Sequence, residues 1–597
     1  MPNVPATWLN EFIVNLTVAG AQDDPDIIQL ANGNILVSWT SQPTTLGATT
    51  DVIGQIFDPV GNRVGTEITL NTASTFDNER NSDLAALPGG GFIVVYHDDN
   101  SPSDGGSNIR LQEYSAAGVA VSDSPVVVED SSTPSDPSYR NPVVAASSDT
   151  SVLIVYDEVS AGIAKTVGKI YNPATNVYGA QFDLITGGSV TGTGDSDVAV
   201  LTNGNYVIVS NRGDADTSIV YKVITSTGSN VVNSSFVTGT NSDNEDDRDA
   251  TVTALTGGGF VIAWTNTDTD LDVIFRVYNA AGAEVNSGTL GVGSATNNNN
   301  EPVVRGLADG SFVIVYDNDE LNRVDVEHFS AGGSSLGTFN FSGVSGTQLS
   351  ATSLADGRFA VAWQSANGEI AMEILDTRNA PNDPGIYSPD QWVVGTTGDD
   401  VFTPNNNAEV TNGGPGNDTI TESGNARQYF GGAGNDQINV VSGVNSDLHD
   451  GGEGVDAINW IGNIGNTGGV VFNLQAGTAV ETAGDGGSTE QMTNFENLLG
   501  TNNADIIIGS FSKTFASNGG FIAVRNRAQK EYLKYYSATQ TFSNALSPVQ
   551  AASVQAAFDI VASQEGRDRR RSLLFRAWRP QVRLWTRRPE QPSPRRP

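Results

Sequence analysis

The stretch LTGGGFVIAW at residues 255–264 belongs to a unit that recurs through the N-terminal part of the chain and decides the fold. Each copy passes through small or polar residues into an apolar strand, and most copies end in Trp or Tyr. The other clear copies are LANGNILVSW (30–39), LPGGGFIVVY (87–96), LADGSFVIVY (307–316) and LADGRFAVAW (354–363), and two weaker ones are SSDTSVLIVY (147–156) and LTNGNYVIVS (201–210). A period of about 50 residues indicates a repeat architecture.

The spacing of these strands predicts the blades of a propeller. A second strand follows each of them, a third segment precedes it, and a fourth, such as TEITLNT (66–72), comes after. Four short strands per unit, repeated seven times, predict an all-β fold with a seven-bladed β-propeller over residues 1–384. The repeated strands are almost continuously apolar, so we expect both of their faces to be buried. The strand ends that set the register are Trp39, Tyr96, Tyr156, Ser210, Trp264, Tyr316 and Trp363, followed by Phe57, Tyr114, Tyr171, Ile224, Tyr278, Phe329 and Leu375.

The last unit has no obvious fourth strand of its own. EFIVNLT at residues 11–17 resembles TEITLNT and belongs to no other unit. We therefore expect residues 9–17 to complete the seventh blade and close the ring, because closure removes exposed strand edges.

The propeller sequence carries no enzyme signature, and no catalytic residue is assigned. There is no Asp-box turn of the sialidase kind, and the three histidines, His97, His328 and His449, are far apart without an HExxH motif. The repeated aromatic residues indicate core packing, since they occupy the same place in each blade. Acidic segments precede the first strand of several blades and fit either cation or sugar contacts or simply solvated loops; they are 23–24, 77–79, 195–197, 243–249 and 297–301.

After a linker at residues 385–394, the chain changes character. GGPGNDTIT (413–421), GGAGNDQIN (431–439) and GGEGVDAIN (451–459) share the frame GGxGxDxUx, and GTTGDDVFT (395–403) has the same frame with Thr396 in place of the second Gly. Their starts, at positions 395, 413, 431 and 451, are separated by steps of 18, 18 and 20. Nine residues make a tight turn and a short strand, so two such units complete one coil of a parallel β-roll and every second turn returns to the same edge.

The residues at fixed positions in these turns predict a row of calcium sites. Asp at the sixth position supplies a carboxylate, and Gly permits a positive φ and turns backbone carbonyls toward the gap between coils. Hard oxygen ligands favour calcium over softer metals. Only this edge is well equipped, because Asp447 and Asp450 on the opposite edge are out of frame. We expect about three strong sites on it. The candidate ligating residues are Asp400, Gly414, Gly416, Asp418, Gly432, Gly434, Asp436, Gly452, Gly454 and Asp456.

These turns resemble the repeats-in-toxin (RTX), or haemolysin-type calcium-binding, family. The resemblance covers residues 395–510, where GTNNADIII (500–508) would be a degenerate fifth unit with Asp505. Blade-like repeats similar to the ones above also occur upstream of such blocks in large secreted bacterial proteins. The resemblance implies a bacterial protein exported by type I secretion machinery through an uncleaved signal near the C-terminus, which folds outside the cell when calcium binds.

Composition is compatible with this interpretation. The chain has 31 basic and 68 acidic residues and no Cys, which excludes a disulfide scaffold and argues against nucleic acid as a partner. The N-terminus lacks the pattern of a cleaved secretory signal, and no apolar run is long enough for a membrane helix.

Residues 511–565 are a possible secretion signal, with a predicted helix at 547–563. Residues 566–597 are basic, with 11 Arg, and are either an arm for anionic surfaces or the product of a shifted reading frame.

The sequence thus predicts a secreted calcium-binding structural or adhesive protein that is extracellular or attached to the cell surface. In it the roll folds on calcium, and the propeller offers a platform for a cell-surface glycan or protein. The alternative is a secreted glycan hydrolase or lyase, which needs carboxylates with an Arg or Tyr at the mouth of the propeller. A lectin, which would expose aromatic residues on the blade loops, also stays open, because propellers host all three functions.

Overall fold

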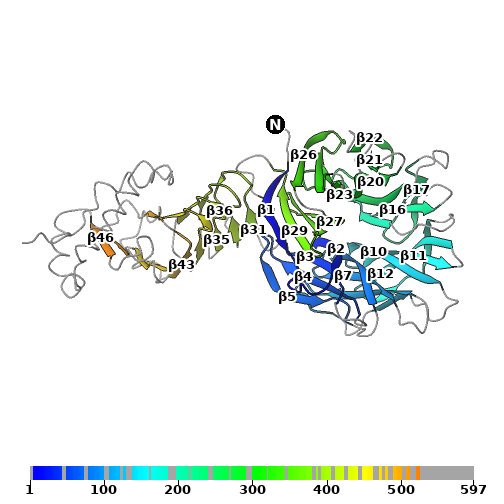
Figure 1. Ribbon diagram of the computed structural model, residues 1–597, viewed down its shortest axis with the longest axis horizontal. Helices are drawn as coiled ribbons and strands as arrows, with labels where there is room; N and C mark the ends of the chain where they lie inside the picture. Colours follow the sequence, from blue (N-terminus) through cyan, green and yellow to red (C-terminus); the bar gives the residue numbers. More distant parts are fainter. Residues whose placement is uncertain are drawn as a thin grey trace, which may run out of the picture. The chain divides into compact units, whose positions relative to one another are not determined.

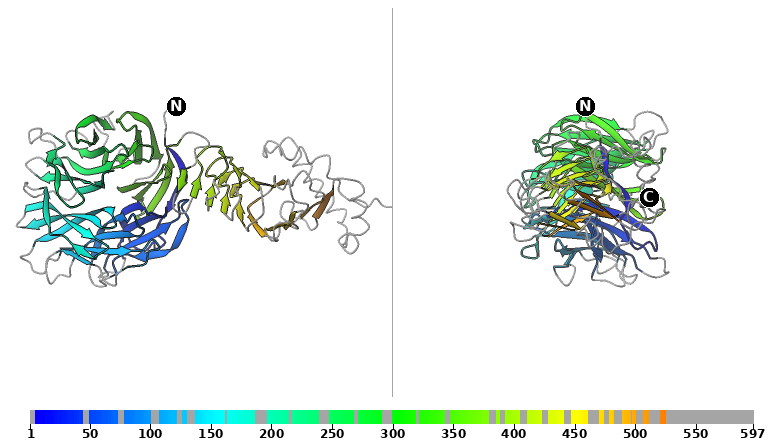
Figure 2. Two further views of the ribbon diagram at one scale, coloured as in Figure 1. Left: turned by 180° about the vertical axis from the view of Figure 1, so that it is seen from behind. Right: turned by 90° about the vertical axis from the view of Figure 1, so that its left-hand side faces the viewer.

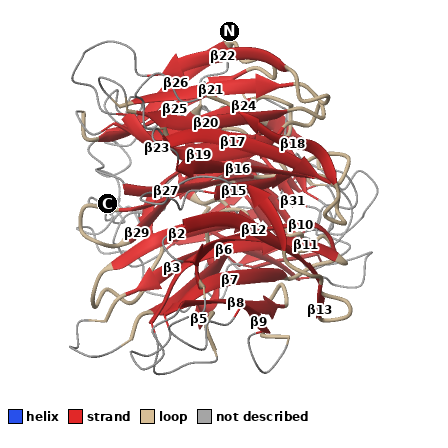
Figure 3. Ribbon diagram, turned by 90° about the vertical axis from the view of Figure 1, so that its right-hand side faces the viewer, coloured by secondary structure: helices blue, strands red, loops and turns tan. Residues whose placement is uncertain are grey.

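The computed structural model contains strands, turns and loops, and no helix in the residues that it describes (Figure 3). No helix that could cross a membrane is present among them. The chain divides into two compact units, residues 1–438 with 450–456, and residues 439–449 with 457–597. The described residues are 5–43, 49–72, 78–99, 107–121, 126–129, 137–160, 163–185, 196–213, 217–238, 247–267, 271–290, 299–318, 321–342, 347–378, 385–387, 392–404, 410–422, 428–440, 447–460, 470–473, 478–481, 489–495, 497–499, 506–510 and 520–524.

Seven antiparallel sheets form a β-propeller in the first unit, which confirms the predicted fold of this region (Figures 1 and 2). The first three blades are β2 (Gln22–Gln29), β3 (Ile35–Ser41), β4 (Asp51–Phe57) and β5 (Arg63–Thr69); β6 (Asn78–Ala86), β7 (Phe92–Asp99), β8 (Ser107–Tyr114) and β9 (Val126–Glu129); and β10 (Ser138–Ser148), β11 (Ser151–Ser160), β12 (Ile163–Asn172), β13 (Val177–Tyr178) and β14 (Phe182–Ile185). The next three are β15 (Ser196–Val200), β16 (Tyr206–Gly213), β17 (Thr217–Ile224) and β18 (Asn230–Phe236); β19 (Arg248–Ala254), β20 (Phe260–Asn266), β21 (Asp272–Tyr278) and β22 (Glu284–Leu290); and β23 (Asn299–Gly306), β24 (Phe312–Asn318), β25 (Arg323–Phe329) and β26 (Ser335–Ser342).

The repeated apolar segments are the second strands of the blades, and they are buried on both faces. The side chains of Val261, Ile262 and Ala263 in β20 are fully buried, although they alternate between the two faces of the sheet. One apolar cluster joins strands of the first and last blades, with Trp39 packed among Val37, Ala360 and Met372. Since each blade packs against its neighbours in this way, continuous apolar strands are what the architecture requires.

The N-terminal strand closes the ring. The seventh sheet has the order β1-β29-β28-β27, made of β27 (Thr347–Ser353), β28 (Arg358–Gln364), β29 (Ile370–Asp376) and β1 (Ala6–Ile13). β1 runs antiparallel to β29, with Ala6 opposite Asp376 and Ile13 opposite Ala371. The strand lies earlier than the expected residues 9–17, because the chain leaves β29 after Val14 and Thr17 bonds to Glu67 of the first blade.

Burial of Glu373 makes this closure sensitive to pH. Its Oε1 accepts a bond from Thr7 Oγ1 of β1 (2.7 Å), and burial raises its pKa to about 7, with Glu11 adding to the effect and the Thr7 bond opposing it. The folded pKa lies above the unfolded value, so this group stabilises the fold below about pH 4.5, and that contribution is lost as the pH rises through 7.

We therefore expect Glu373→Gln to leave the melting temperature unchanged at pH 4.5. At pH 8 the variant should be more stable than the wild type by on the order of 2 kcal/mol, because a neutral amide accepts the Thr7 bond without carrying a buried charge. Calorimetry at the two pH values measures the difference. Equal melting temperatures for the two proteins at pH 8 would contradict the expected role of Glu373.

Short parallel strands follow the propeller in the same unit. We call residues 392–438 and 450–456 the coil stack. In it β31 pairs in parallel with β33 and β33 with β35, so that Trp392, Val410 and Gln428 lie in register, each one coil after the last. The residues predicted as a linker, 385–394, contain β30 and β31. The strands from here to residue 460 are β30 (Gly385–Tyr387), β31 (Trp392–Val394), β32 (Val401–Phe402), β33 (Val410–Asn412), β34 (Thr419–Thr421), β35 (Gln428–Phe430), β36 (Ala433–Gly434), β37 (Gln437–Val440), β38 (Leu448–Asp450), β39 (Glu453–Gly454) and β40 (Ala457–Trp460).

The second unit also contains only strands where it is described. β40 pairs in parallel with β44, while β41, β42 and β43 pair antiparallel, as do β45 and β46. The predicted helix at 547–563, the basic tail at 566–597 and Asp505 lie outside the described residues. The further strands are β41 (Val470–Asn473), β42 (Thr478–Glu481), β43 (Thr489–Thr493), β44 (Asn497–Leu499), β45 (Ile506–Ser510) and β46 (Gly520–Val524).

Candidate metal centre

The structure brings the four aspartates of the repeated turns together in one row. Each lies at the end of its turn, directly before the next strand, and all four side chains are buried. The backbone N–H of each of the first three donates to the Oδ1 of the aspartate in the next turn, at 2.8 Å in all three steps. The row runs through Asp400, Asp418, Asp436 and Asp456.

A second row of side chains lies on the exposed side of the turns and repeats with the same spacing from coil to coil. Asn417 donates its N–H and its Nδ2 to Asp399 Oδ1 (2.8 and 2.9 Å), and Asn435 donates the same two groups to Asn417 Oδ1 (both 3.0 Å). These bonds lower the pKa of Asp399. Because side chains of successive coils are bonded to one another, neighbouring turns are held at a fixed spacing.

The glycines let the turns stack closely. A Cβ built on Gly434 would lie 1.6 Å from the Gly416 carbonyl oxygen, and Gly434 has a φ of +138°. An L side chain fits neither this conformation nor this space. The six predicted glycines all have a positive φ; they are Gly414, Gly416, Gly432, Gly434, Gly452 and Gly454.

Two oxygen atoms approach the first glycine of a turn on the side where a side chain would lie. A Cβ on Gly413 would lie 2.4 Å from Asp418 Oδ2 and 2.3 Å from the Gly431 carbonyl oxygen. One coil later, a Cβ on Gly431 would lie 2.6 Å from Asp436 Oδ2 and 2.3 Å from the Gly451 carbonyl oxygen. A carboxylate oxygen and a carbonyl oxygen of the next coil therefore face the same space in both places.

Two of these carboxylate oxygens receive no hydrogen bond within the part of the chain that the structure describes. Asp418 Oδ2 and Asp436 Oδ2 are buried and accept no bond from the described residues. A buried oxygen without a donor is costly, and a bound ion is one explanation for its presence. The donor set of carboxylates and carbonyls is the kind that hard cations such as calcium bind. The residues present therefore fit the predicted metal.

The electrostatics of the row favour a cation. Burial raises the pKa of Asp418 to about 8 and that of Asp436 to about 7; bonds from neighbouring backbone N–H groups oppose this, and adjacent aspartates add to it. Both carboxyl groups are hard to ionise together because they are buried and neighbouring carboxylates repel them. A divalent cation in the space would remove this obstacle by pairing with the ionised forms.

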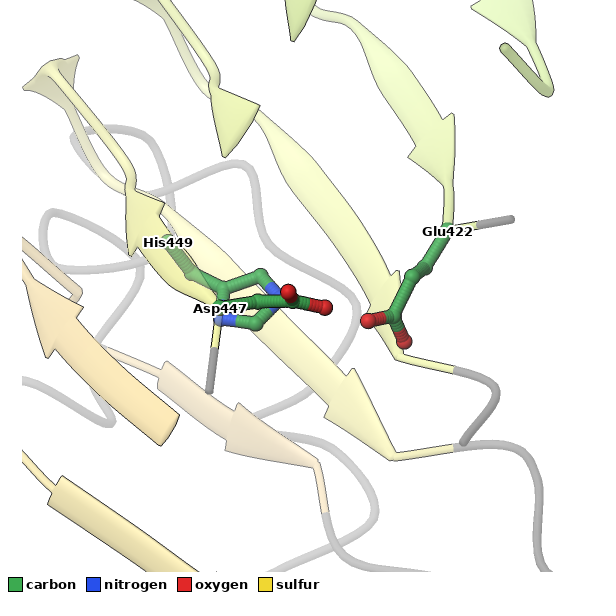
Figure 4. Close-up of side chains that lie close together, drawn as sticks. All are labelled: Glu422, Asp447 and His449. Atoms are coloured by element: carbon green, nitrogen blue, oxygen red, sulfur yellow. The ribbon is translucent and has the colours of Figure 1, made fainter. Parts of the chain in front are cut away.

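Asp447 and His449, in the second unit, form a buried pair that the sequence did not single out as a site. Figure 4 draws their side chains together with that of Glu422, which is also buried but belongs to the first unit. The ligand atoms of Asp447 and His449 lie within 4.8 Å of one another. Burial lowers the pKa of His449 to about 4, although Asp447 opposes this, so its imidazole is neutral at pH 7. Only the spacing Asp-x-His at 447–449 could have drawn attention to the pair.

A second group of acids lines the inner strands of the propeller. Asp26, Asp83 and Asp197 lie on β2, β6 and β15 and are partly exposed. Each accepts a backbone N–H from the inner strand of the next blade; the donors are Leu84, Val144 and Val252 (2.9, 2.5 and 2.8 Å). These bonds fasten neighbouring blades together.

The same acids interact electrostatically with one another and with Arg305 of β23. Burial raises the pKa of Asp83 well above its usual range, Asp26 and Asp197 raise it further, and Arg305 opposes them. Burial also raises the pKa of Asp26. Carboxylates on the inner strands of different blades therefore interact electrostatically with one another and with an arginine of a further inner strand.

The acidic segments noted in the sequence have a structural role where they are described. The inner strands β2, β23 and β27 carry a β-bulge at a corresponding place, and each bulge contains a residue with a positive φ. Asp24 and Gln348, from the first and last blades, exchange two hydrogen bonds, and Gln348 N–H donates to Glu301 Oε2 (2.7 Å). These polar side chains therefore connect neighbouring blades. Residues 77, 195, 243–246 and 297–298 lie outside the described residues.

Comparison with protein families gives one match. A model described as aminotransferase class I and II matches residues 483–578. Only 489–495, 497–499, 506–510 and 520–524 of this segment are described, and they form strands and the turns next to them. A match over so small a part of the chain does not assign it to that family. No curated protein matches the sequence significantly.

Several solved structures are similar to the chain at low identity. A protein of unknown function from Dyadobacter fermentans has 11% identity and a TM-score of 0.40, covering 63% of this chain and 99% of its own. An α-L-arabinanase from Penicillium chrysogenum, complexed with arabinobiose, has 14% identity and a TM-score of 0.40, covering 62% and 99%. The NanB sialidase from Streptococcus pneumoniae has 10% identity and a TM-score of 0.37, covering 62% and 71%. Likeness at this level carries no argument about the activity of this chain.

Proposed function

We propose that this chain is a secreted, RTX-type calcium-binding protein of structural or adhesive role. The observation that carries the proposal is the row of buried aspartates, in which Asp418 Oδ2 and Asp436 Oδ2 face carbonyl oxygens and accept no hydrogen bond from the described residues. Asp418, Asp436 and Asp456, with carbonyl oxygens of the turns, would hold the metal. The metal would supply charge neutralisation, and no chemical step is assigned to it.

The same arrangement couples metal binding to folding. Without a cation, the row places acidic groups close together in a buried position, and their mutual repulsion opposes closure of the coils. A site made by successive coils exists only in the folded chain, so the free energy of binding adds to the free energy of folding. Export through type I secretion machinery and folding outside the cell agree with this coupling, and the propeller would then present its loops to a surface glycan or protein.

The test is a calcium titration of the full chain by isothermal calorimetry, with far-UV circular dichroism on the same samples. We expect saturable calcium binding with a gain in β-structure, no such response to magnesium, and the loss of one or more bound ions in Asp436→Asn. The matched control is Asp183→Asn, an exposed carboxylate of the propeller paired with Lys165, which should leave calcium binding unchanged. An identical titration of Asp436→Asn and the wild type would refute the proposed site.

A second candidate function is a glycan-active enzyme that uses the centre of the propeller. The observation in its favour is the cluster of Asp26, Asp83 and Asp197 with Arg305. Carboxylates with a raised pKa, as Asp26 and Asp83 have, serve as the acid in glycoside cleavage. An assay of the full chain on a panel of polysaccharides, with Asp83→Asn as the comparison, decides this candidate independently of calcium binding.

A further inference from the structure

The first coil differs from the later coils at the Oδ2 of its aspartate, the carboxylate oxygen that faces the proposed position of a metal ion. In this coil Thr396 replaces the second glycine, and both its backbone N–H and its hydroxyl donate to Asp400 Oδ2 (2.7 and 2.9 Å). The corresponding oxygens of Asp418 and Asp436 receive no donor from the described residues. The carboxylate of Asp400 is therefore satisfied by the protein itself.

Two donors at this oxygen work against a cation. An N–H and an O–H that point at a carboxylate oxygen direct their positive ends into the space that a metal ion would occupy. Hard cations need lone pairs from several oxygens at once, and at Asp400 Oδ2 these lone pairs are already used.

The propeller contributes further donors to the same turn. The Gly395 carbonyl oxygen accepts a bond from Trp8 Nε1 (3.2 Å) and one from Arg378 Nη2 (2.9 Å). Arg378 Nη1 also donates to the Val394 carbonyl oxygen (3.3 Å). The carbonyls of Gly431 and Gly451, at the same position of later turns, face the spaces beside Asp418 and Asp436. The Gly395 carbonyl is instead bound by a tryptophan and by a cation.

Both donors are held rigidly by the propeller. Arg378 is paired with Asp376 at the end of β29 (2.8 Å). The indole of Trp8, on the closing strand β1, is stacked by the guanidinium of Arg358 at 4.0 Å from the ring centroid, and Arg358 in turn is paired with the buried Asp356 (2.7 Å). The first turn is therefore fixed by the blade that closes the ring.

We propose that the first coil is a metal-free cap that the propeller holds in place, and that the row of calcium ions begins at Asp418. This inference rests on the proposed calcium binding. Asp400 is an anchoring residue of the cap, and Trp8 and Arg378 are positioning residues that hold the cap in the conformation on which the next coil stacks.

The first experiment compares calcium stoichiometry by isothermal calorimetry in full-length Asp400→Asn and Asp418→Asn. We expect Asp418→Asn to lose at least one ion and Asp400→Asn to keep the wild-type number, because the amide oxygen still accepts the Thr396 bonds. If both variants lost the same number of calcium ions, the proposal of a metal-free cap would be wrong. A wild-type chain that binds no calcium would instead refute the proposed function.

The second experiment tests the positioning role through the calcium midpoint of the circular dichroism change. Trp8→Phe keeps an aromatic ring over Arg358 but removes the bond to Gly395, so we expect the midpoint to rise about fivefold at unchanged stoichiometry. Trp363→Phe is the matched control, since this buried indole in the same blade has no hydrogen-bond partner at Nε1 among the described residues. A midpoint that shifts equally in both variants, or in neither, would overturn the positioning role.

Discussion

Replacing Gly434 with alanine should abolish the proposed calcium-dependent folding of the coil stack. The new Cβ would lie 1.6 Å from the Gly416 carbonyl oxygen, which is backbone and cannot move aside without displacing the neighbouring coil. The φ of +138° adds strain for any L side chain. We expect the folding free energy of the coil stack to become less favourable by roughly 3 kcal/mol or more. This loss should prevent stacking of the coils at the calcium concentration that folds the wild type.

The matched control is Gly398→Ala. Gly398 occupies the same position of the first turn, but its φ lies outside the positive region, and the nearest atom to an added Cβ is Thr396 Oγ1 at 3.9 Å. This variant should bind calcium and fold as the wild type does. Far-UV circular dichroism and calorimetry in calcium compare the two variants, and a Gly434→Ala protein with normal binding would mean that the coils do not stack as described.

Deleting residues 1–17 should destabilise the entire propeller. The deletion removes β1, exposes the edge of β29 and takes Trp8 out of the cluster that joins the first and last blades. Loss of the buried Trp8 side chain alone should cost about 3–5 kcal/mol. We expect the melting temperature of the propeller to fall by on the order of 10 °C, or the protein to aggregate through its open edge.

Two controls separate ring closure from a general effect of truncation. Deletion of residues 1–4, which precede the strand, should leave the melting temperature unchanged. A synthetic peptide of residues 1–17, added to the truncated protein, should restore stability by pairing with β29. A truncated protein that melts like the wild type would contradict closure by β1.

The blades were predictable because their signal is local and repeated. An apolar strand ending at Trp39, Trp264 or Trp363 has the same surroundings in every blade, so seven copies reinforce one interpretation. The row of aspartates was predictable for the same reason, since a nearly constant step along the sequence places identical turns above one another. The repeats in the sequence were therefore enough to predict both the propeller fold and the row of aspartates.

The contacts between the repeats were not predictable. Trp8 and Gly395 come from opposite ends of the first unit's sequence, and no sequence period relates them. The end of β1 was not predictable either, because Thr17 bonds to Glu67 of the first blade, a residue 50 positions further along the chain. The central position of Asp26 and Asp83 follows from bulges in the inner strands, and nothing in the local sequence marks these as different from solvated loop acids. Thr396 was visible as a deviation from the repeat, but its bonds to Asp400 were not.

Closure by the N-terminal strand also determines how the protein would respond to mechanical force. Ala6, at the start of β1, lies opposite Asp376, at the end of β29 and close to the point where the chain leaves the propeller. Tension between the N-terminus and the coil stack would therefore load this residue pair first and unzip the two strands one hydrogen bond at a time. The bonds of Trp8 and Arg378 to Gly395 lie at the end of β1 and β29 where this separation begins. They would therefore bear the tension before any other blade is stretched.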